Sequence, residues 1–468
     1  MIKRLLLILT VLLNVCITKG ITFSNNGIYY NTIDENSVEV TVNNNQYSGD
    51  MIIPSSVQYN GTIYTVIGIG HNAFASDEGL TSITMPPSIA TIGFWAFYNC
   101  TGLTTVNLPE GLTTISKSAF EYCTNLSFIT FPEGLNTIGH AAFSNCDSLT
   151  NLNLPEGLSI ISNNAFSSCS NLVSVNIPHT VAVIQISAFN NCISLTNVDI
   201  PEGVTTIGSQ AFYSCSSLTS VTLPNTITTI GYGSFAHCTN LAALNLPENL
   251  TSIGGAAFNS CHNLTSVVIP EGITTIEDYT FQSCIGLTSI TFPETLTTIR
   301  YGALFSCNSL PTLTIPANVT LIEDSAFFEC TALTSVTVHM QVPVPITLSV
   351  FGSLARWEVP LYVPEGTIDA YEEAYVWQDF APISAILDIP SNEKLPDFKL
   401  YPNPAQDLLY IKNNSINKIQ KFNVFDTQGK EVIVGTGNFI NLSDLQRGLY
   451  IITIETEKEI ITKKFIKE

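Results

Sequence analysis

The sequence predicts a mostly β chain with short helical turns, in which a long repeat solenoid precedes a small C-terminal β-sandwich. Two observations lead to this prediction. Cysteines recur every 23 residues from Cys100 to Cys330, and fixed periods of this length are typical of stacked solenoids. Between residues 400 and 468, apolar and polar residues alternate between turns, which indicates short strands.

The charge balance also divides the chain near residue 390, shortly before the predicted β-sandwich begins. Residues 21–390 contain 28 acidic and three basic residues, whereas residues 391–468 contain 10 acidic and 11 basic ones. Such an acidic body argues against nucleic-acid partners, because phosphate contacts need Lys and Arg. It also argues against electrostatic docking on anionic lipid.

The N-terminus has the pattern of an export signal, which we place at residues 1–20. Lys3 and Arg4 precede an apolar run over 5–16 that is too short for a comfortable membrane span. No other stretch approaches membrane length, so we expect no transmembrane segment in the mature chain. Residues 21–66 alternate between apolar and polar side chains, and this pattern predicts a small N-terminal β-cap.

Residues 67–340 form the repeat, with about twelve units of 23 residues. Relative to each Cys, an Ile stands eight residues before and a Leu three after, and a Phe stands three before except at Leu304. This period predicts a leucine-rich repeat solenoid. A single unit cannot bury these side chains, so neighbouring units stack and their strands pair in parallel about 4.8 Å apart.

The ends of the repeat are marked by a loss of its pattern. A Pro that follows each strand recurs until Pro316 and is replaced by His339, where we expect the solenoid to stop. Residues 341–388 are predicted to form a C-terminal cap. It contains a short helix from about Thr367 with Ile368, Tyr371 and Tyr375 on one face. Residues 389–399 are a predicted linker, and the β-sandwich occupies 400–468.

Two columns of the repeat are candidates for metal or redox chemistry. The eleven column cysteines lack the close spacing of metal ligands, and their stacked side chains point in parallel. We therefore expect buried free thiols that act as small apolar side chains. Glutamates recur after the Pro, where calcium could bridge them, although the alternative is a solvated turn: Glu110, Glu133, Glu156, Glu202, Glu248, Glu271 and Glu294.

The outward strand face is the candidate ligand surface. Most of its positions are Thr, Ser and Asn, which either satisfy the sheet itself or make weak, multivalent contacts. Three residues depart from this pattern, namely Phe128, Asp199 and Val268. Together with Asn151, Asn153 and Asn176 they are the predicted ligand-contact residues. Trp95, Lys117 and His140 lie on the opposite arm.

Catalytic motifs are missing from the sequence. The six histidines fall in several columns, and we find no Ser/His/Asp order, no HExxH and no glycine-rich phosphate loop. We therefore expect neither an enzyme nor a bound cofactor or metal.

The repeat resembles the BspA-like leucine-rich repeat surface proteins of Bacteroidetes. The residues that carry the resemblance follow the pattern "IGxxAFxxCxxLTSVxLPEGLTT" over most units from about 65 to 340. This resemblance implies a secreted or surface protein that binds host proteins or other cells.

The tail resembles the C-terminal sorting domain of the type IX secretion system. The resemblance implies that the tail contacts the secretion machinery and is removed after export, with the body released or attached to the outer-membrane surface. The residues that carry it are Tyr401, Pro402, Asn403, Pro404, Asp426, Gly429, Lys430, Gly448, Tyr450, Lys464 and Phe465.

We therefore expect an exported adhesin that contacts matrix or cell-surface protein. The alternative is a glycan-binding or calcium-dependent surface scaffold.

Overall fold

The computed structural model describes residues 20–43, 46–386, 398–401, 405–413, 419–426, 429–456 and 460–467. The chain separates into two compact units, Met1–Ile386 and Leu387–Glu468, and each is described by itself. The predicted export signal lies outside the described residues except for Gly20, and so does the predicted linker except for its last two residues.

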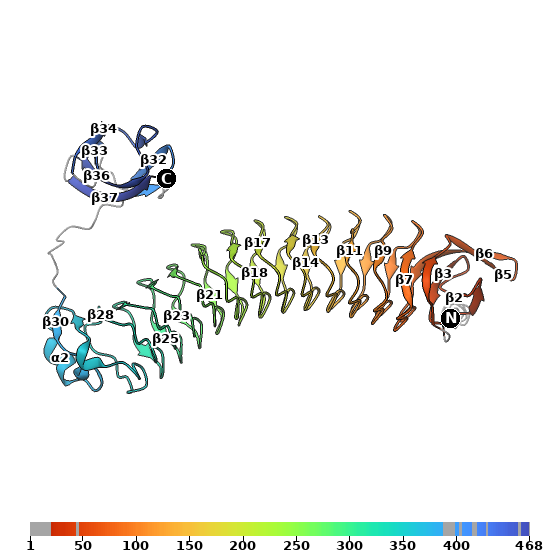
Figure 1. The fold of residues 1–468 in the computed structure, drawn as a ribbon, viewed down its shortest axis with the longest axis horizontal. Helices are drawn as coiled ribbons and strands as arrows, with labels where there is room; N and C mark the ends of the chain where they lie inside the picture. Colours follow the sequence, from red (N-terminus) through yellow and green to blue (C-terminus); the bar gives the residue numbers. More distant parts are fainter. Residues whose placement is uncertain are drawn as a thin grey trace, which may run out of the picture. The chain divides into compact units, whose positions relative to one another are not determined.

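The first unit begins with a β-cap that is continuous with the solenoid (Figure 1). Strands β1, β2 and β3 form an antiparallel meander, and β5 and β6 form a hairpin. β6 also pairs in parallel with β3 and with β8, so the cap sheet runs directly into the repeat. The cap strands are β1 (Thr22–Asn25), β2 (Ile28–Thr32), β3 (Ser37–Thr41), β4 (Gly49–Ile52), β5 (Ser56–Tyr59) and β6 (Thr62–Ile69).

Nearly every 23-residue rung contributes one strand to what we call the long-strand face, and the rung of Ala243 contributes only an isolated bridge to Ser220. Strands of this face form several short parallel sheets, in which each strand pairs with the strand of the next rung, as for Asn197 opposite Ser220. The middle side chain of a three-residue strand such as Ser174–Asn176 is buried, and the two flanking ones are exposed. The strands are β7 (Leu80–Thr84), β9 (Thr105–Asn107), β11 (Phe128–Ile129), β13 (Asn151–Asn153), β15 (Ser174–Asn176), β17 (Asn197–Asp199), β19 (Ser220–Thr222), β22 (Ser266–Val268), β24 (Ser289–Thr291), β26 (Thr312–Ile315) and β28 (Ser335–Val338).

A second parallel ladder of two-residue strands forms another side of each rung. Its second residue, the Ile of the repeat, is buried in every rung. The strands are β8 (Thr91–Ile92), β10 (Thr114–Ile115), β12 (Thr137–Ile138), β14 (Ile160–Ile161), β16 (Val183–Ile184), β18 (Thr206–Ile207), β20 (Thr229–Ile230), β21 (Ser252–Ile253), β23 (Thr275–Ile276), β25 (Thr298–Ile299) and β27 (Leu321–Ile322).

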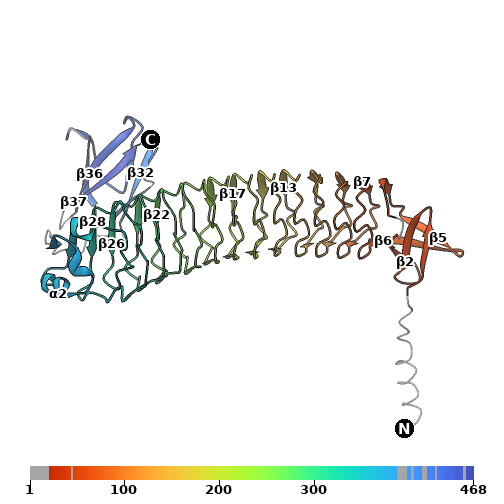
Figure 2. The ribbon, with the colours of Figure 1, turned by 60° about the horizontal axis from the view of Figure 1, so that its bottom comes forward.

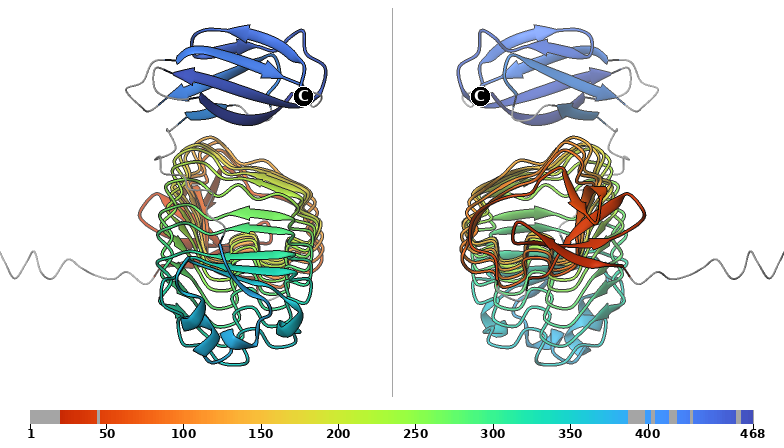
Figure 3. Two further views of the ribbon diagram at one scale, coloured as in Figure 1. Left: turned by 90° about the vertical axis from the view of Figure 1, so that its left-hand side faces the viewer. Right: turned by 90° about the vertical axis from the view of Figure 1, so that its right-hand side faces the viewer.

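The third side, which we call the turn edge, is residues 93–100 and their equivalents in the other rungs. It folds into tight turns, with N–H groups bonded three residues back, as from Cys100 to Phe97. Its remaining donors reach the next rung: the N–H of Phe97 bonds the carbonyl of Ala119 at 2.7 Å. Backbone hydrogen bonds therefore join neighbouring rungs on all three sides, and the rungs overlap with a progressive offset when viewed along the solenoid (Figure 3).

The core of the solenoid is built from stacked columns. Ten Phe rings from Phe74 to Phe281 stack face to face with ring centroids 4.8–5.7 Å apart and planes within 10°. Leu304 interrupts this column. The column cysteines lie buried beside it, so the repeating residues of the sequence are the buried ones.

The C-terminal cap continues the sheet beyond the last rung (Figure 2). β28 pairs in parallel with β29, and β29 pairs with β30, so parallel pairing does not stop at His339 as expected. The solenoid has about fourteen turns rather than twelve. The cap elements are η1 (Arg356–Glu358), β29 (Leu361–Val363), α2 (Ile368–Glu373), η2 (Trp377–Asp379) and β30 (Ile383–Ala385).

The cap helix begins where the sequence predicts but is shorter. Thr367 is its N-cap and Tyr371 is buried. Tyr375 is exposed, and its predicted place on the same helix face as Ile368 and Tyr371 is wrong because the backbone becomes extended at Ala374, before Tyr375.

The second unit is a sandwich of two antiparallel sheets, with strand orders β31-β32-β35 and β34-β33-β36-β37. Side chains of both sheets share one core, which includes Leu409, Ile440, Val424 and Ile452. The predicted mostly β fold, with a repeat solenoid and a small β domain, is therefore confirmed. The strands are β31 (Phe398–Tyr401), β32 (Leu408–Asn413), β33 (Ile419–Phe425), β34 (Glu431–Gly435), β35 (Phe439–Asn441), β36 (Gly448–Thr456) and β37 (Ile460–Lys467).

Candidate functional site

The polar residues of the long-strand face bond to one another along the solenoid. Asn176 donates from Nδ2 to Oδ1 of Asn153 at 2.7 Å, and the Ser174 hydroxyl donates to Oδ1 of Asn151 at 2.6 Å. The Thr222 hydroxyl donates to Oδ1 of Asp199 at 2.8 Å. Four of the six predicted ligand-contact residues therefore belong to side-chain ladders that link neighbouring rungs.

Phe128 and Val268 differ from this ladder because they are apolar and face outward. Their exposed fractions are 66% and 65%. Phe128 lies next to Thr105 in the neighbouring strand, and Val268 lies next to Thr291. The two residues are six rungs apart, which corresponds to about 29 Å at the spacing of paired strands. Phe128 and the asparagines occupy consecutive rungs, and Val268 is separate from them.

The structure shows a hollow on the turn edge that the sequence did not predict. It has a volume of about 570 Å³ and is lined by side chains from several rungs, among them Trp95, Tyr98, Lys117, Tyr122 and His140. The Lys117 ammonium lies 5.7 Å from the centre of the Trp95 ring. Tyr98 and Tyr122 meet edge to face at 5.6 Å. The unusual residues on this arm could have indicated the hollow, but only Lys117 and His140 share a column of the repeat, and Trp95 and Tyr122 belong to two others.

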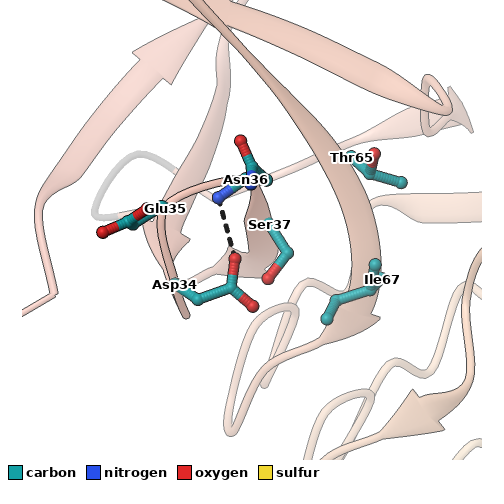
Figure 4. Close-up of a pocket in the computed structure, with 6 residues that line it drawn as sticks. All are labelled: Asp34, Glu35, Asn36, Ser37, Thr65 and Ile67. Atoms are coloured by element: carbon teal, nitrogen blue, oxygen red, sulfur yellow. Dashed lines mark hydrogen bonds between the residues drawn. The ribbon is translucent and has the colours of Figure 1, made fainter.

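A second hollow lies in the N-terminal cap (Figure 4) and is lined by residues 34–37 with Thr65 and Ile67. The Asn36 N–H donates to Oδ1 of Asp34 at 2.8 Å. The nearby Ser37 hydroxyl and the Asn36 N–H hold the pKa of the Asp34 carboxyl below its usual value. The Glu35 carboxylate points away from that of Asp34, so the two acids do not converge on one point.

The column cysteines are all free and buried, which confirms the expected packing role. Each thiol donates to the carbonyl oxygen of the residue 26 positions earlier, as from Cys146 to Phe120 at 3.1 Å. Burial raises the pKa of these thiols, and for Cys284 the value is about 12. Neutral thiols with a high pKa are poor nucleophiles and poor metal ligands.

The glutamates of the Pro-Glu turns are exposed along the solenoid edge. Within the part of the chain that the structure describes, no group of three His, Cys, Asp or Glu side chains has an arrangement that could hold a metal ion.

Two of the three basic residues between 21 and 390 are paired with acids. Arg300 lies 3.0 Å from Glu277 and 3.8 Å from Glu323. Arg356 in the C-terminal cap lies 3.1 Å from Asp379. The third basic residue, Lys117, makes no ion pair within the described residues.

Several predicted secretion residues shape the hairpins of the second unit. The Lys430 N–H donates to Oδ1 of Asp426 at 2.9 Å, and Gly429 has a positive φ of 80° in the same turn. Such a backbone conformation favours glycine. Asp426, Gly429 and Lys430 therefore close the β33–β34 hairpin.

Other residues of that motif lie in the last hairpin. Tyr450 stacks on the buried ring of Phe465 at 5.6 Å, and its hydroxyl donates to the Gln446 carbonyl at 2.8 Å. Gly448 begins β36 opposite Lys467, and Lys464 pairs with Ile451. Tyr401 ends β31, whereas Pro402, Asn403 and Pro404 lie outside the described residues.

Comparison with protein families agrees with this geometry. A family described as a BspA type leucine rich repeat region matches in six copies over residues 41–173, 159–285 and 251–352. A secretion system C-terminal sorting domain matches residues 399–468. The chain therefore belongs to the BspA-type leucine-rich repeat family and carries a sorting domain of the type IX secretion system.

Solved structures of bacterial repeat proteins are similar to the chain. One is a leucine rich cell surface protein from Faecalibacterium prausnitzii A2-165, with 26% identity, 71% of this chain and 92% of that chain covered, and a TM-score of 0.52. Another is a leucine-rich repeat protein from Bacteroides ovatus ATCC 8483, with 26% identity and a TM-score of 0.58. The match covers 78% of this chain and 99% of that chain. A search of curated proteins found no match.

The sorting domain indicates secretion and attachment to the cell surface. Among the described residues, no helix has the length and apolar character needed to cross a membrane.

Proposed function

We propose that the protein is an exported adhesin that uses the long-strand face to bind matrix or cell-surface protein. The observation that carries the proposal is the exposed Phe128 beside a ladder of amide and hydroxyl groups on consecutive rungs. Exposed aromatic anchors surrounded by polar groups are typical of protein interfaces. Membership of a family of bacterial surface proteins supports the same function.

Export and processing belong to this proposal. The export signal over 1–20 and the sorting domain over 400–468 are removed, and the repeat body remains at the cell surface or is released. Mass spectrometry of the surface-exposed protein tests this: peptides from 400–468 should be missing there and present in the cell extract. Their presence in the surface protein would contradict processing of the tail.

The binding proposal is tested with the full chain on immobilised matrix proteins and whole cells. Phe128→Thr introduces the residue found at the same position in the preceding rung, Thr105, so the strand is retained. We expect binding to fall at least roughly tenfold, as for loss of an aromatic anchor, with unchanged thermal stability.

The matched control is Ile160→Thr, which removes another exposed apolar side chain from the short ladder, where other rungs carry Thr. This variant should bind like the original protein. Equal loss of binding in both variants, or none in Phe128→Thr, would refute the assignment to the long-strand face.

A further inference from the structure

The turn edge carries aromatic side chains that the packing of the solenoid does not use. Trp95 and Tyr122 each expose 40% of their surface, and both line the open hollow of about 570 Å³. Tyr98 also lines the hollow and meets Tyr122 edge to face. The other lining residues are mostly polar or charged, among them Asn72, Glu121 and Asn164, so the hollow combines aromatic faces with hydrogen-bonding groups.

The backbone at these positions favours other residues. Trp95 has a φ of 53° and Tyr122 a φ of 64°, in the left-handed region that bulky side chains avoid. The same conformation recurs in other rungs, where the equivalents of Trp95 include Asn72 and Asn164 and those of Tyr122 include Asn145. Asn tolerates this conformation better. Bulky residues that persist in such conformations are associated with functional sites.

Lys117 adds a positive charge to the same hollow. Its ammonium lies 5.7 Å from the Trp95 ring centre, and it has no carboxylate within ion-pair distance in the described part of the chain. Glu121 also lines the hollow but makes no such pair. Because Arg300 and Arg356 are already paired, Lys117 is the cation of the solenoid that is available to a ligand anion.

The aromatic area is small. In the rungs that follow, the turn edge carries Asn163, Asn164 and Ser168, so the apolar surface ends within a few rungs. A stable protein interface buries about 800 Å² on each partner, and the aromatic hollow alone is far smaller. Its size and its mixture of aromatic faces, amides, the Lys117 ammonium and the Glu121 carboxylate fit a saccharide, which has apolar ring faces and a hydroxyl rim that can donate to a carboxylate.

We propose that this hollow binds an acidic saccharide. A sugar ring lies against Trp95 and Tyr122, and its carboxylate pairs with the Lys117 ammonium. The site is on the turn edge and does not include Phe128, so it is independent of the protein-binding face proposed above.

The experiment measures binding of the full chain to oligosaccharides ending in glucuronic acid, galacturonic acid or N-acetylneuraminic acid. The matched neutral probe ends in glucose, which differs from glucuronic acid only by the carboxylate. Calorimetry reports binding, and tryptophan fluorescence in a Trp357→Phe, Trp377→Phe background reports on Trp95. At least one acidic probe should bind. If the glucuronic acid probe binds, its affinity should exceed that of the glucose probe.

Lys117→Met keeps the length of the side chain and removes its charge. It should weaken the acidic ligand roughly tenfold or more, as for loss of a charge-assisted hydrogen bond, and leave the neutral probe unchanged. Trp95→Asn and Tyr122→Asn copy neighbouring rungs, so they should fold normally and bind neither probe. Tyr232→Ser, at an exposed aromatic residue outside the hollow, should behave like the original protein.

Three results would overturn the proposal. One is no binding of any acidic probe at millimolar concentration. Another is unchanged affinity of the acidic ligand in Lys117→Met. The third is a protein partner whose capture depends on Trp95 while saccharides do not compete, which would make the hollow a protein-docking site.

Discussion

The thiol of Cys215 donates a hydrogen bond to the carbonyl oxygen of Phe189 in the preceding rung, at 3.3 Å. The same relationship holds along the whole Cys column, with donor–acceptor distances of 2.9–3.3 Å. Each cysteine therefore fills a small apolar space and satisfies one carbonyl of its neighbour. Free Cys commonly takes such a packing role.

This arrangement predicts how the thiols react. In the folded protein, a thiol reagent should modify almost none of the eleven column cysteines, because they are buried and burial raises their pKa. After denaturation without reductant, all eleven should react. Cys16 is replaced by Ser so that the count concerns the column alone. A count near zero after denaturation would mean that the thiols are oxidised.

The stacked Phe column predicts a graded response to truncation. Phe212 is fully buried between Phe189 and Phe235. Phe212→Ala should lower the free energy of unfolding by about 3–5 kcal/mol because it leaves a cavity. Phe212→Leu should cost much less, since Leu304 occupies the same column in another rung. Chemical denaturation measures both, and equal losses would contradict a packing role that depends on volume.

Asp77 occupies the Cys position of the first rung and predicts a pH dependence. Burial raises the pKa of its carboxyl to about 6, above the roughly 3.9 of an unfolded chain. The folded state therefore holds the proton more tightly, and this contribution to stability is full below the unfolded pKa. It is lost as pH rises from about 4 through 6. Asp77→Asn should remove that dependence and be relatively more stable at pH 7.

The control for Asp77 is Asp50, whose pKa shifts the other way. Hydrogen bonds from the Ser82 and Thr81 hydroxyls lower the pKa of the Asp50 carboxyl. Its contribution is present above the unfolded pKa and is lost as pH falls. For each Asn variant, thermal melts from pH 3 to 8 give the difference in melting temperature from the original protein. This difference should change with pH in opposite directions for Asp77→Asn and Asp50→Asn. Parallel trends would contradict the assigned shifts.

The C-terminal cap predicts local rather than global loss of order. Trp377 is buried, contacts the Phe351 and Tyr371 rings and donates from Nε1 to the Val344 carbonyl at 2.9 Å. Trp377→Ala should cost about 3–5 kcal/mol of local stability. Hydrogen exchange should rise in β28–β30 but not in the middle rungs, because a solenoid unit contacts only its neighbours. The exposed Trp357 supplies the control, Trp357→Ala.

Much of the fold could be predicted because the same residues recur every 23 positions. A fixed period states which side chains stack, so the buried Ile, Phe, Cys and Leu columns follow from the sequence. The end of the solenoid was harder to predict from the sequence. Strand pairing needs only backbone groups, so the loss of the Pro at His339 does not stop it. The helix end at Ala374 likewise has no Gly or Pro to mark it.

The candidate site was harder to predict than the fold. Column alignment compares each residue with its equivalents, and it identified Phe128 and Val268 as exceptions. The hollow, however, brings together Trp95, Lys117 and Tyr122 from three different columns and two rungs. Contacts between different columns of adjacent rungs depend on the direction in which each turn points its side chains. The repeat pattern does not contain that information.

The hydrogen bond from Cys215 to Phe189 and the stack of Phe rings both join a residue to one in an adjacent rung. Removing or duplicating 23 residues in phase would therefore recreate every such contact at the new junction. The solenoid can lengthen or shorten only in whole rungs without loss of these contacts. The length of the solenoid can therefore change in steps of one rung by recombination between repeats, while both caps and the sorting domain stay unaltered.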